Sequence, residues 1–85
     1  MELWFINIYR EDRCRKIADV DTTEEYWKVI NNFMDERNFK SYYQRLWVDN
    51  NELWNDVGSH TEFFVLKEPS VDFLRNLLGD EFKWE

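Results

Sequence analysis

The chain has 85 residues and a formal net charge of −7, from 18 acidic and 11 basic side chains. This length supports one hydrophobic core, so we expect a single domain over residues 1–85, and the charge argues against direct binding to nucleic acid, which needs Lys and Arg to neutralise phosphates. The apolar runs are too short to cross a membrane and the single cysteine, Cys14, cannot close an internal disulfide, so we expect a cytoplasmic protein that binds no membrane.

The first predicted element is a β-hairpin. Leu3–Tyr9 is apolar and aromatic, and the charged residues 10–13 separate it from a second stretch, Cys14–Val20. Alternation puts apolar side chains on both faces of the first stretch, with Trp4, Ile6 and Ile8 on one face and Leu3, Phe5 and Tyr9 on the other. We therefore expect a central strand, or an edge strand that another element covers.

A helix is predicted to begin at Thr23. Thr22 and Glu25 have the spacing of a capping box, in which the hydroxyl accepts from a backbone N–H group and the carboxylate reaches back to the cap. The helix should end near Arg37 and Asn38, because asparagine tolerates the left-handed conformation that often follows a last turn. One apolar stripe along it consists of Tyr26, Trp27, Ile30, Phe33 and Met34, and we expect this stripe to pack on a sheet.

Strand signals return in the second half of the chain. Tyr42–Asp49 and Glu52–Val57 flank Asn50-Asn51, a pair that suits the positive φ angles of a two-residue hairpin turn. After a bend at residues 58–60, Thr61–Lys67 forms a fifth strand. Alternation in this strand puts Phe63 and Val65 on one face and Phe64 and Leu66 on the other.

A short helix follows Pro69 and Ser70. Its predicted apolar face consists of Val71, Leu74, Leu77 and Leu78, with Gly79 as the stop signal. The element order is therefore ββαβββα. This order predicts an α+β fold, with a mostly antiparallel sheet and two helices packed on one of its faces.

The segment Asp56–Glu62 holds the single histidine, His60, beside Ser59 and two carboxylates. A Ser–His–acid mechanism needs the three side chains to converge, whereas neighbours in sequence diverge around a bend. We interpret the segment as a turn rich in hydrogen-bonding side chains. No catalytic residue is predicted, and we do not expect an enzyme.

Cofactor and metal sites are also not predicted. One histidine without a nearby cysteine does not complete a zinc site, and no loop supplies the oxygens that calcium needs. Gly58 and Gly79 stand alone, so no phosphate-binding loop is present. Cys14 lies between Arg13 and Arg15, which can lower a thiol pKa, but we favour a structural role because no histidine or second cysteine is close in sequence.

The aromatic content points to binding. Aromatic residues make up 19 % of the chain, and the second hairpin has them on both faces, more than one core needs. From Leu46 to Leu66 the chain has no Lys or Arg. Trp and Tyr are typical of interface hot spots, and acidic residues beside them favour a basic partner. The predicted binding residues are Tyr43, Trp47, Asp49, Glu52, Trp54, Asp56, His60 and Glu62. The alternative is that a second copy of the chain covers these aromatics in a homodimer.

The run Trp54–Phe64, after Tyr42–Trp47, resembles small acidic proteins of unknown function encoded by phages and prophages of Gram-positive bacteria. The resemblance carries over no catalytic residue. It implies a setting in the cytoplasm of an infected or lysogenic bacterium, and a protein that inhibits a host protein, such as a nucleic-acid-binding or defence protein. An acidic surface facing a basic site would then act as a DNA mimic. A homo-oligomeric structural or accessory phage protein is the alternative.

Overall fold

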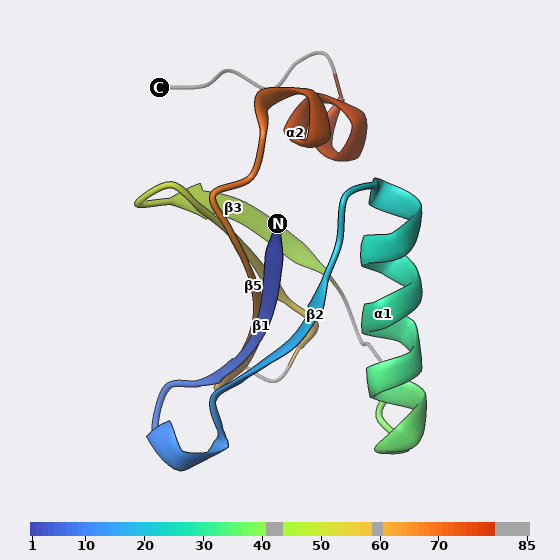
Figure 1. The fold of residues 1–85 in the computed structure, drawn as a ribbon. Helices are drawn as coiled ribbons and strands as arrows, with labels where there is room; N and C mark the ends of the chain where they lie inside the picture. The colour runs from blue at the N-terminus through green and yellow to red at the C-terminus, as the bar shows by residue number, and fades with distance from the viewer. Residues whose placement is uncertain (41–43, 59–60, 80–85) are drawn as a thin grey trace.

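A five-stranded antiparallel sheet is the framework of the protein. The computed structural model describes residues 1–40, 44–58 and 61–79 (Figure 1). The elements in chain order are β1 (Glu2–Asn7), a 3₁₀ turn (Glu11–Arg13), β2 (Arg15–Asp19), α1 (Thr23–Glu36), β3 (Arg45–Asp49), β4 (Glu52–Asp56), β5 (Glu62–Lys67) and α2 (Val71–Leu78). The strand order across the sheet is β2-β1-β5-β4-β3. The predicted α+β fold and the ββαβββα order are confirmed.

β1 is an internal strand, as its two apolar faces predict. It pairs with β2 on one side and with β5 on the other. The assignment of Ile8 and Tyr9 to the strand faces is wrong, because β1 ends at Asn7 and these side chains are 50 % and 77 % exposed. Asn7 ends the strand by turning the backbone: its Oδ1 atom accepts hydrogen bonds from the N–H groups of Tyr9 and Arg10, at 3.0 and 2.9 Å.

The start and end of α1 follow from local chemistry. The Thr22 hydroxyl accepts a hydrogen bond from the N–H group of Glu25 at 3.1 Å, and it donates to the Glu25 carboxylate at 3.2 Å. Beyond the last turn, Asn38 adopts a φ of 54°, in the left-handed region that asparagine tolerates. Four residues of the predicted stripe are buried and Trp27 is half-buried, so the stripe is confirmed.

The core lies between the two helices and one face of the sheet. The sheet residues that point toward the helices come from alternate positions: Leu3, Phe5, Leu53, Phe64 and Leu66. One polar pair is buried among them, where the Asn55 Nδ2 group donates to the Tyr26 hydroxyl at 3.2 Å. Burial raises the pKa of the Tyr26 hydroxyl well above its usual range, because the charged phenolate would be poorly solvated there.

The β3–β4 hairpin has the predicted two-residue turn. Asn50 and Asn51 have φ angles of 51° and 60°, and Asp49 pairs directly with Glu52. Positive φ at both positions matches the twist of the flanking strands. This turn sets the register that pairs Trp47 with Trp54 across the two strands.

α2 closes one end of the core, beside the N-terminal end of α1 (Figure 1). The Ser70 hydroxyl caps it by accepting from the N–H group of Phe73 at 3.1 Å. The buried residues are Phe73 and Leu74, and the Phe73 ring lies edge-on to Tyr26 at 5.6 Å. The prediction that Val71 belongs to the buried face is wrong: its side chain is 43 % exposed in the first turn, and Phe73 takes the inward position.

Candidate functional site

The face of the sheet that points away from α1 and α2 carries six apolar side chains from four strands. We name it the open face and define it by Trp4, Ile6, Trp47, Trp54, Phe63 and Val65. These residues are register partners across the sheet, as in Trp4 with Val65 and Ile6 with Phe63. Directly paired residues of antiparallel strands share a face, and their sequence neighbours point into the core. No described helix covers the open face (Figure 1).

An aromatic cluster forms the centre of the open face. The rings of Trp47 and Trp54 stack across β3 and β4, with 6.1 Å between centroids and 19° between planes. Phe63 of β5 meets both rings edge-on, at 5.9 Å from Trp47 and 5.6 Å from Trp54. These contacts fix the rings, so little side-chain entropy would be lost when another molecule packs on them.

Charged side chains of both signs surround the aromatic cluster. Lys67 forms an ion pair with Glu52, and its Nζ atom lies 5.9 Å from the Trp4 ring. The guanidinium of Arg45 lies 5.6 Å from the Trp47 ring.

The β1–β2 edge adds further pairs. Lys16 Nζ lies 3.0 Å from Asp19 and 3.9 Å from Glu2, and the hydrogen bond with Asp19 raises the Lys16 pKa above its usual value. The Trp4 indole N–H donates to Glu2 at 3.2 Å. The rim of the open face is therefore polar. Its two lysines are in ion pairs, whereas Arg45 and Asp49 form none with the described residues.

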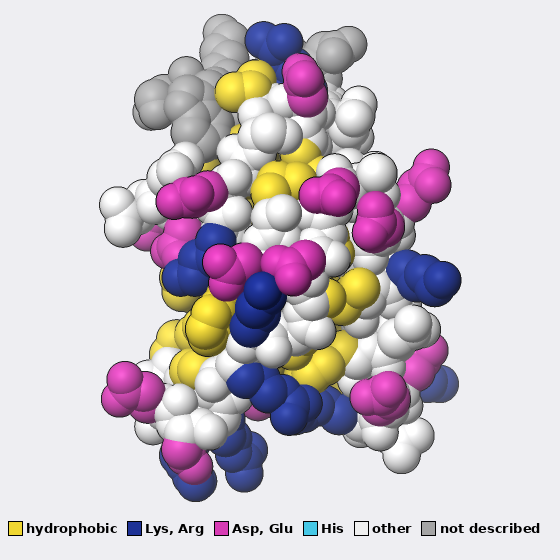
Figure 2. All heavy atoms as spheres, viewed as in Figure 1, with side chains coloured by type: hydrophobic (Ala, Val, Ile, Leu, Met, Phe, Trp, Pro, Cys, Tyr) yellow, Lys and Arg dark blue, Asp and Glu magenta, His cyan; other side chains and the backbone are white. Residues whose placement is uncertain are grey.

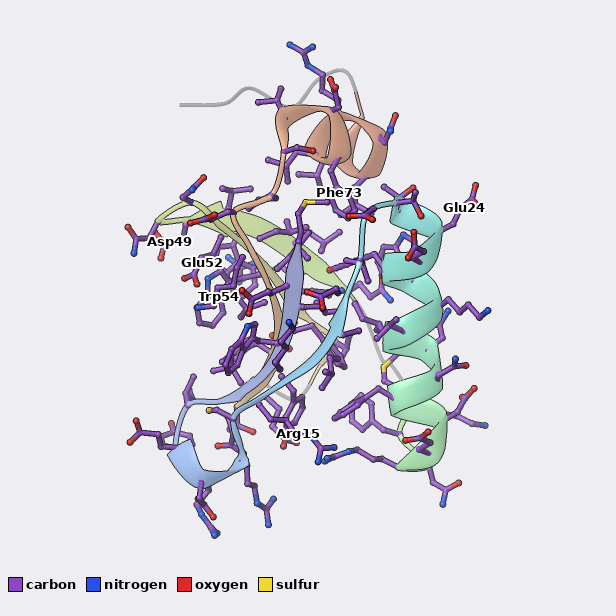
Figure 3. All side chains as sticks on the ribbon, viewed as in Figure 1. Arg15, Glu24, Asp49, Glu52, Trp54 and Phe73 are labelled. Atoms are coloured by element: carbon purple, nitrogen blue, oxygen red, sulfur yellow. The ribbon has the colours of Figure 1, made fainter. Side chains whose placement is uncertain are left out.

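Five of the predicted binding residues lie on this face or at its edge, among them Asp56, which pairs with Phe63. Trp47 and Trp54 belong to the aromatic cluster, Glu52 is in the rim ion pair, and Asp49 is exposed at the hairpin end. In Figure 3 the side chains of Asp49, Glu52 and Trp54 lie on the side of the sheet away from α1.

The acidic stretch does not form one surface. Asp56 is only 5 % exposed, and its carboxylate accepts a hydrogen bond from the N–H group of Gly58 at 2.9 Å. Glu62 points to the helix side of the sheet, where it accepts a hydrogen bond from the Asn7 side chain at 3.3 Å. Strand alternation explains the position of Glu62, because Glu62 and Phe63 must point to opposite faces. Asp56 pairs with Phe63 and shares its face, but it is buried at the end of β4. Tyr43 and His60 lie outside the described residues.

Sequence reasoning missed Trp4, Phe63 and Lys67 as members of the site. They are far from the second hairpin in sequence, and they join it because β5 lies between β1 and β4 in the sheet. The alternation of Leu3–Tyr9 could have indicated Trp4, because it puts Trp4 and Ile6 on the face of the strand opposite Leu3 and Phe5.

One donor on the open face lacks an acceptor. The indole N–H of Trp54 is buried, and no acceptor for it is found among residues 1–40, 44–58 and 61–79. An unsatisfied buried donor destabilises a fold by about 1–3 kcal/mol. Within the described part of the chain, ring contacts with Trp47 and Phe63 hold Trp54 in place.

Side chains suited to a metal ion do not gather in the described part of the chain. No cluster of three or more His, Cys, Asp or Glu side chains suited to a metal ion occurs there. Cys14 is half-buried, and its Sγ atom accepts a hydrogen bond from the N–H group of Asn7 at 3.3 Å, which closes the β1–β2 connection. Neither described helix is long and apolar enough to cross a membrane.

Comparison with protein-family models, curated proteins and solved structures finds no match to this chain.

Proposed function

We propose that this chain is a protein-binding module and that the open face is its contact surface. The observation that carries the proposal is the aromatic cluster of Trp47, Trp54 and Phe63 on a sheet face that no described helix covers. Rigid Trp and Phe rings inside a polar rim are the usual composition of an interface hot spot. The rings supply apolar area, and the surrounding charges supply orientation.

Single-stranded nucleic acid also stacks on aromatic sheet faces, but that mode needs a positive groove for the phosphates. Here the two lysines beside the aromatics are neutralised by Glu52, Glu2 and Asp19. Protein is therefore the better partner class for this surface.

The finer proposal is a phage-type inhibitor that occupies a basic, nucleic-acid-binding surface of a host protein. The net charge of −7 supports it, as does the resemblance of the second hairpin to phage proteins. On the β3–β4 hairpin, Asp49 is the exposed carboxylate, whereas Glu52 is ion-paired and Asp56 is buried. Asp49 is thus the residue with which to test attraction to a basic partner.

A homo-oligomeric structural or accessory protein is the second candidate. The rim of the open face holds both signs of charge, so two copies related by a two-fold axis can bring opposite charges together. In that case the open faces of two copies would cover each other. Sedimentation over a range of concentrations separates the two candidates, because only self-association depends on the concentration of this chain alone.

Replacing Trp47 with Ala should remove partner binding. The change deletes one ring of the stacked pair on the open face, and truncating a central aromatic anchor weakens binding by about 2 kcal/mol or more, which is about thirtyfold in affinity. The measurement compares capture of a partner from host lysate by wild type and by Trp47→Ala, both first shown to be folded by circular dichroism.

Trp27→Ala is the matched control, because Trp27 is a half-buried tryptophan on α1, away from the open face. The same partner should be retained by Trp27→Ala and lost by Trp47→Ala. Retention by both variants would contradict the proposed surface. Asp49→Lys should weaken partner binding if the partner is basic, and it should make the affinity less dependent on salt concentration. An unchanged salt dependence would contradict the proposal that the chain inhibits a host protein by occupying a basic surface.

A further inference from the structure

A second site lies on the opposite side of the sheet from the open face. A cavity of about 230 Å³ opens under the C-terminal end of α1. Its walls come from the sheet, from α1 and from the segment after it: Phe5, Phe33, Met34, Arg37, Phe39, Val57, Glu62 and Phe64. It shares no residue with the open face, so it stands independently of the proposed function.

Three phenylalanine rings form a fixed apolar floor. The centroids of Phe5 and Phe33 are 4.9 Å apart, and Phe64 meets Phe33 edge-on at 5.6 Å and Phe5 at 5.9 Å. An apolar cavity of about 150 Å³ is enough to hold benzene. The space here therefore accepts one aromatic ring with a short substituent.

Two arginines lie beside these rings. The guanidinium of Arg37 is 4.3 Å from the centroid of Phe33 and 4.9 Å from that of Phe5. The guanidinium of Arg15 is 5.4 Å from the same Phe33 ring. Figure 3 shows Arg15 extending from β2 toward the C-terminal half of α1, and in Figure 2 basic side chains lie over an apolar patch between these two elements.

Neither arginine forms an ion pair with a described residue, although the chain has 18 acidic side chains. Glu62 lines the same cavity, and its carboxylate accepts a hydrogen bond from Asn7 at 3.3 Å. An anionic ligand must therefore keep its charged group at the arginine side and its apolar part among the rings. Arginine presents a planar set of donors that matches a carboxylate.

We propose that this cavity binds a small aromatic carboxylate. The aromatic ring packs in the cavity beside Phe5, Phe33 and Phe64, and the carboxylate is held by Arg37, which lines the cavity. Arg15, next to the same Phe33 ring, adds a second positive charge nearby. The two guanidiniums then gain the anionic partner that the described side chains do not supply, and the ligand ring fills the cavity that the phenylalanines line.

The test titrates the full chain with 3-phenylpropionate and follows backbone amide shifts by NMR. For a ligand of this size we expect a Kd of about 1 mM or tighter, with shifts confined to the residues around the cavity. The matched probe is 3-phenylpropanamide, which has the same ring and nearly the same shape but no charge. It should bind at least about tenfold more weakly, because it forms no charge-assisted hydrogen bonds with the guanidiniums.

Arg37→Gln and Arg15→Gln should each weaken binding of 3-phenylpropionate, Arg37→Gln by about tenfold. Arg45→Gln is the control, because Arg45 packs on Trp47 on the open face. These arginines are exposed, so folded variants are expected, and the NMR spectrum of each variant verifies this. The proposal is overturned if 3-phenylpropionate gives no shifts at 10 mM or shifts the open face instead. Equal binding of acid and amide, or an unchanged Kd in both Arg37→Gln and Arg15→Gln, overturns it as well.

Discussion

Replacing Phe64 with Ala is expected to lower the free energy of unfolding by about 3–5 kcal/mol, the range measured for buried phenylalanines. Phe64 is 2 % exposed, and its ring contacts both Phe5 and Phe33 in the core. Its removal deletes contacts on both sides of the interface between α1 and the sheet. Because small domains are stable by about 5–15 kcal/mol in total, this single change should leave the chain marginally folded. Urea denaturation followed by circular dichroism measures the effect.

Phe63→Ala is the matched control, since it removes the same ring one position earlier in β5. Phe63 is half-buried on the open face, where its ring packs against Trp47 and Trp54. We expect Phe63→Ala to lower the free energy of unfolding by about 1–2 kcal/mol, because part of this ring is already in water and truncation leaves no closed cavity. An equal decrease in the free energy of unfolding for Phe63→Ala and Phe64→Ala would contradict the assignment of Phe63 to the open face and Phe64 to the core.

A second large effect is expected at alkaline pH. Burial raises the pKa of Tyr26 in the folded protein, so an unfolded chain loses the tyrosine proton near pH 10 while the native protein keeps it. Above that pH the unfolded state binds fewer protons than the native state, and stability must fall as pH rises. Below pH 10 the stabilisation that depends on protonated Tyr26 is fully present. Above pH 10 the free energy of unfolding should fall by about 1.4 kcal/mol per pH unit because of Tyr26. Urea denaturation at intervals between pH 9 and pH 11.5 measures this slope.

Tyr26→Phe is the comparison variant. It should be less stable than wild type at neutral pH by about 1–3 kcal/mol, because the buried Asn55 Nδ2 group loses its acceptor. Its stability should nevertheless depend less steeply on pH above 10, since the titrating group is gone. Identical slopes for the two proteins would show that Tyr26 does not stay protonated in the fold.

Much of the fold could be predicted from short-range patterns. The Thr22 cap, the stripe on α1 and the Asn50-Asn51 turn each depend on residues within a few positions of one another, and their backbone geometry is set locally. Alternation within β5 correctly separated Phe63 from Phe64. The Val71 error arose because a short helix offers two overlapping apolar faces, and only packing against Tyr26 selects Phe73.

The site was harder to predict because it depends on strand order. The predicted residues came from one continuous stretch, whereas the open face is assembled from β1, β3, β4 and β5. Glu62 was predicted to bind together with Trp54, yet the two side chains point to opposite faces of the sheet. Charge counted along the chain also misled, because it did not show that Lys67 would neutralise Glu52. The distribution of acidic residues over a surface is a property of the sheet register.

The most direct test of the central claim is oxidative footprinting of tryptophans in the captured complex and in the free protein. We expect a bound partner to protect Trp4 and Trp47 of the open face and to leave the oxidation of Trp27 on α1 unchanged. Protection of Trp27 alone, or equal oxidation of Trp4 and Trp47 with and without partner, would contradict the assignment of the open face as the binding surface.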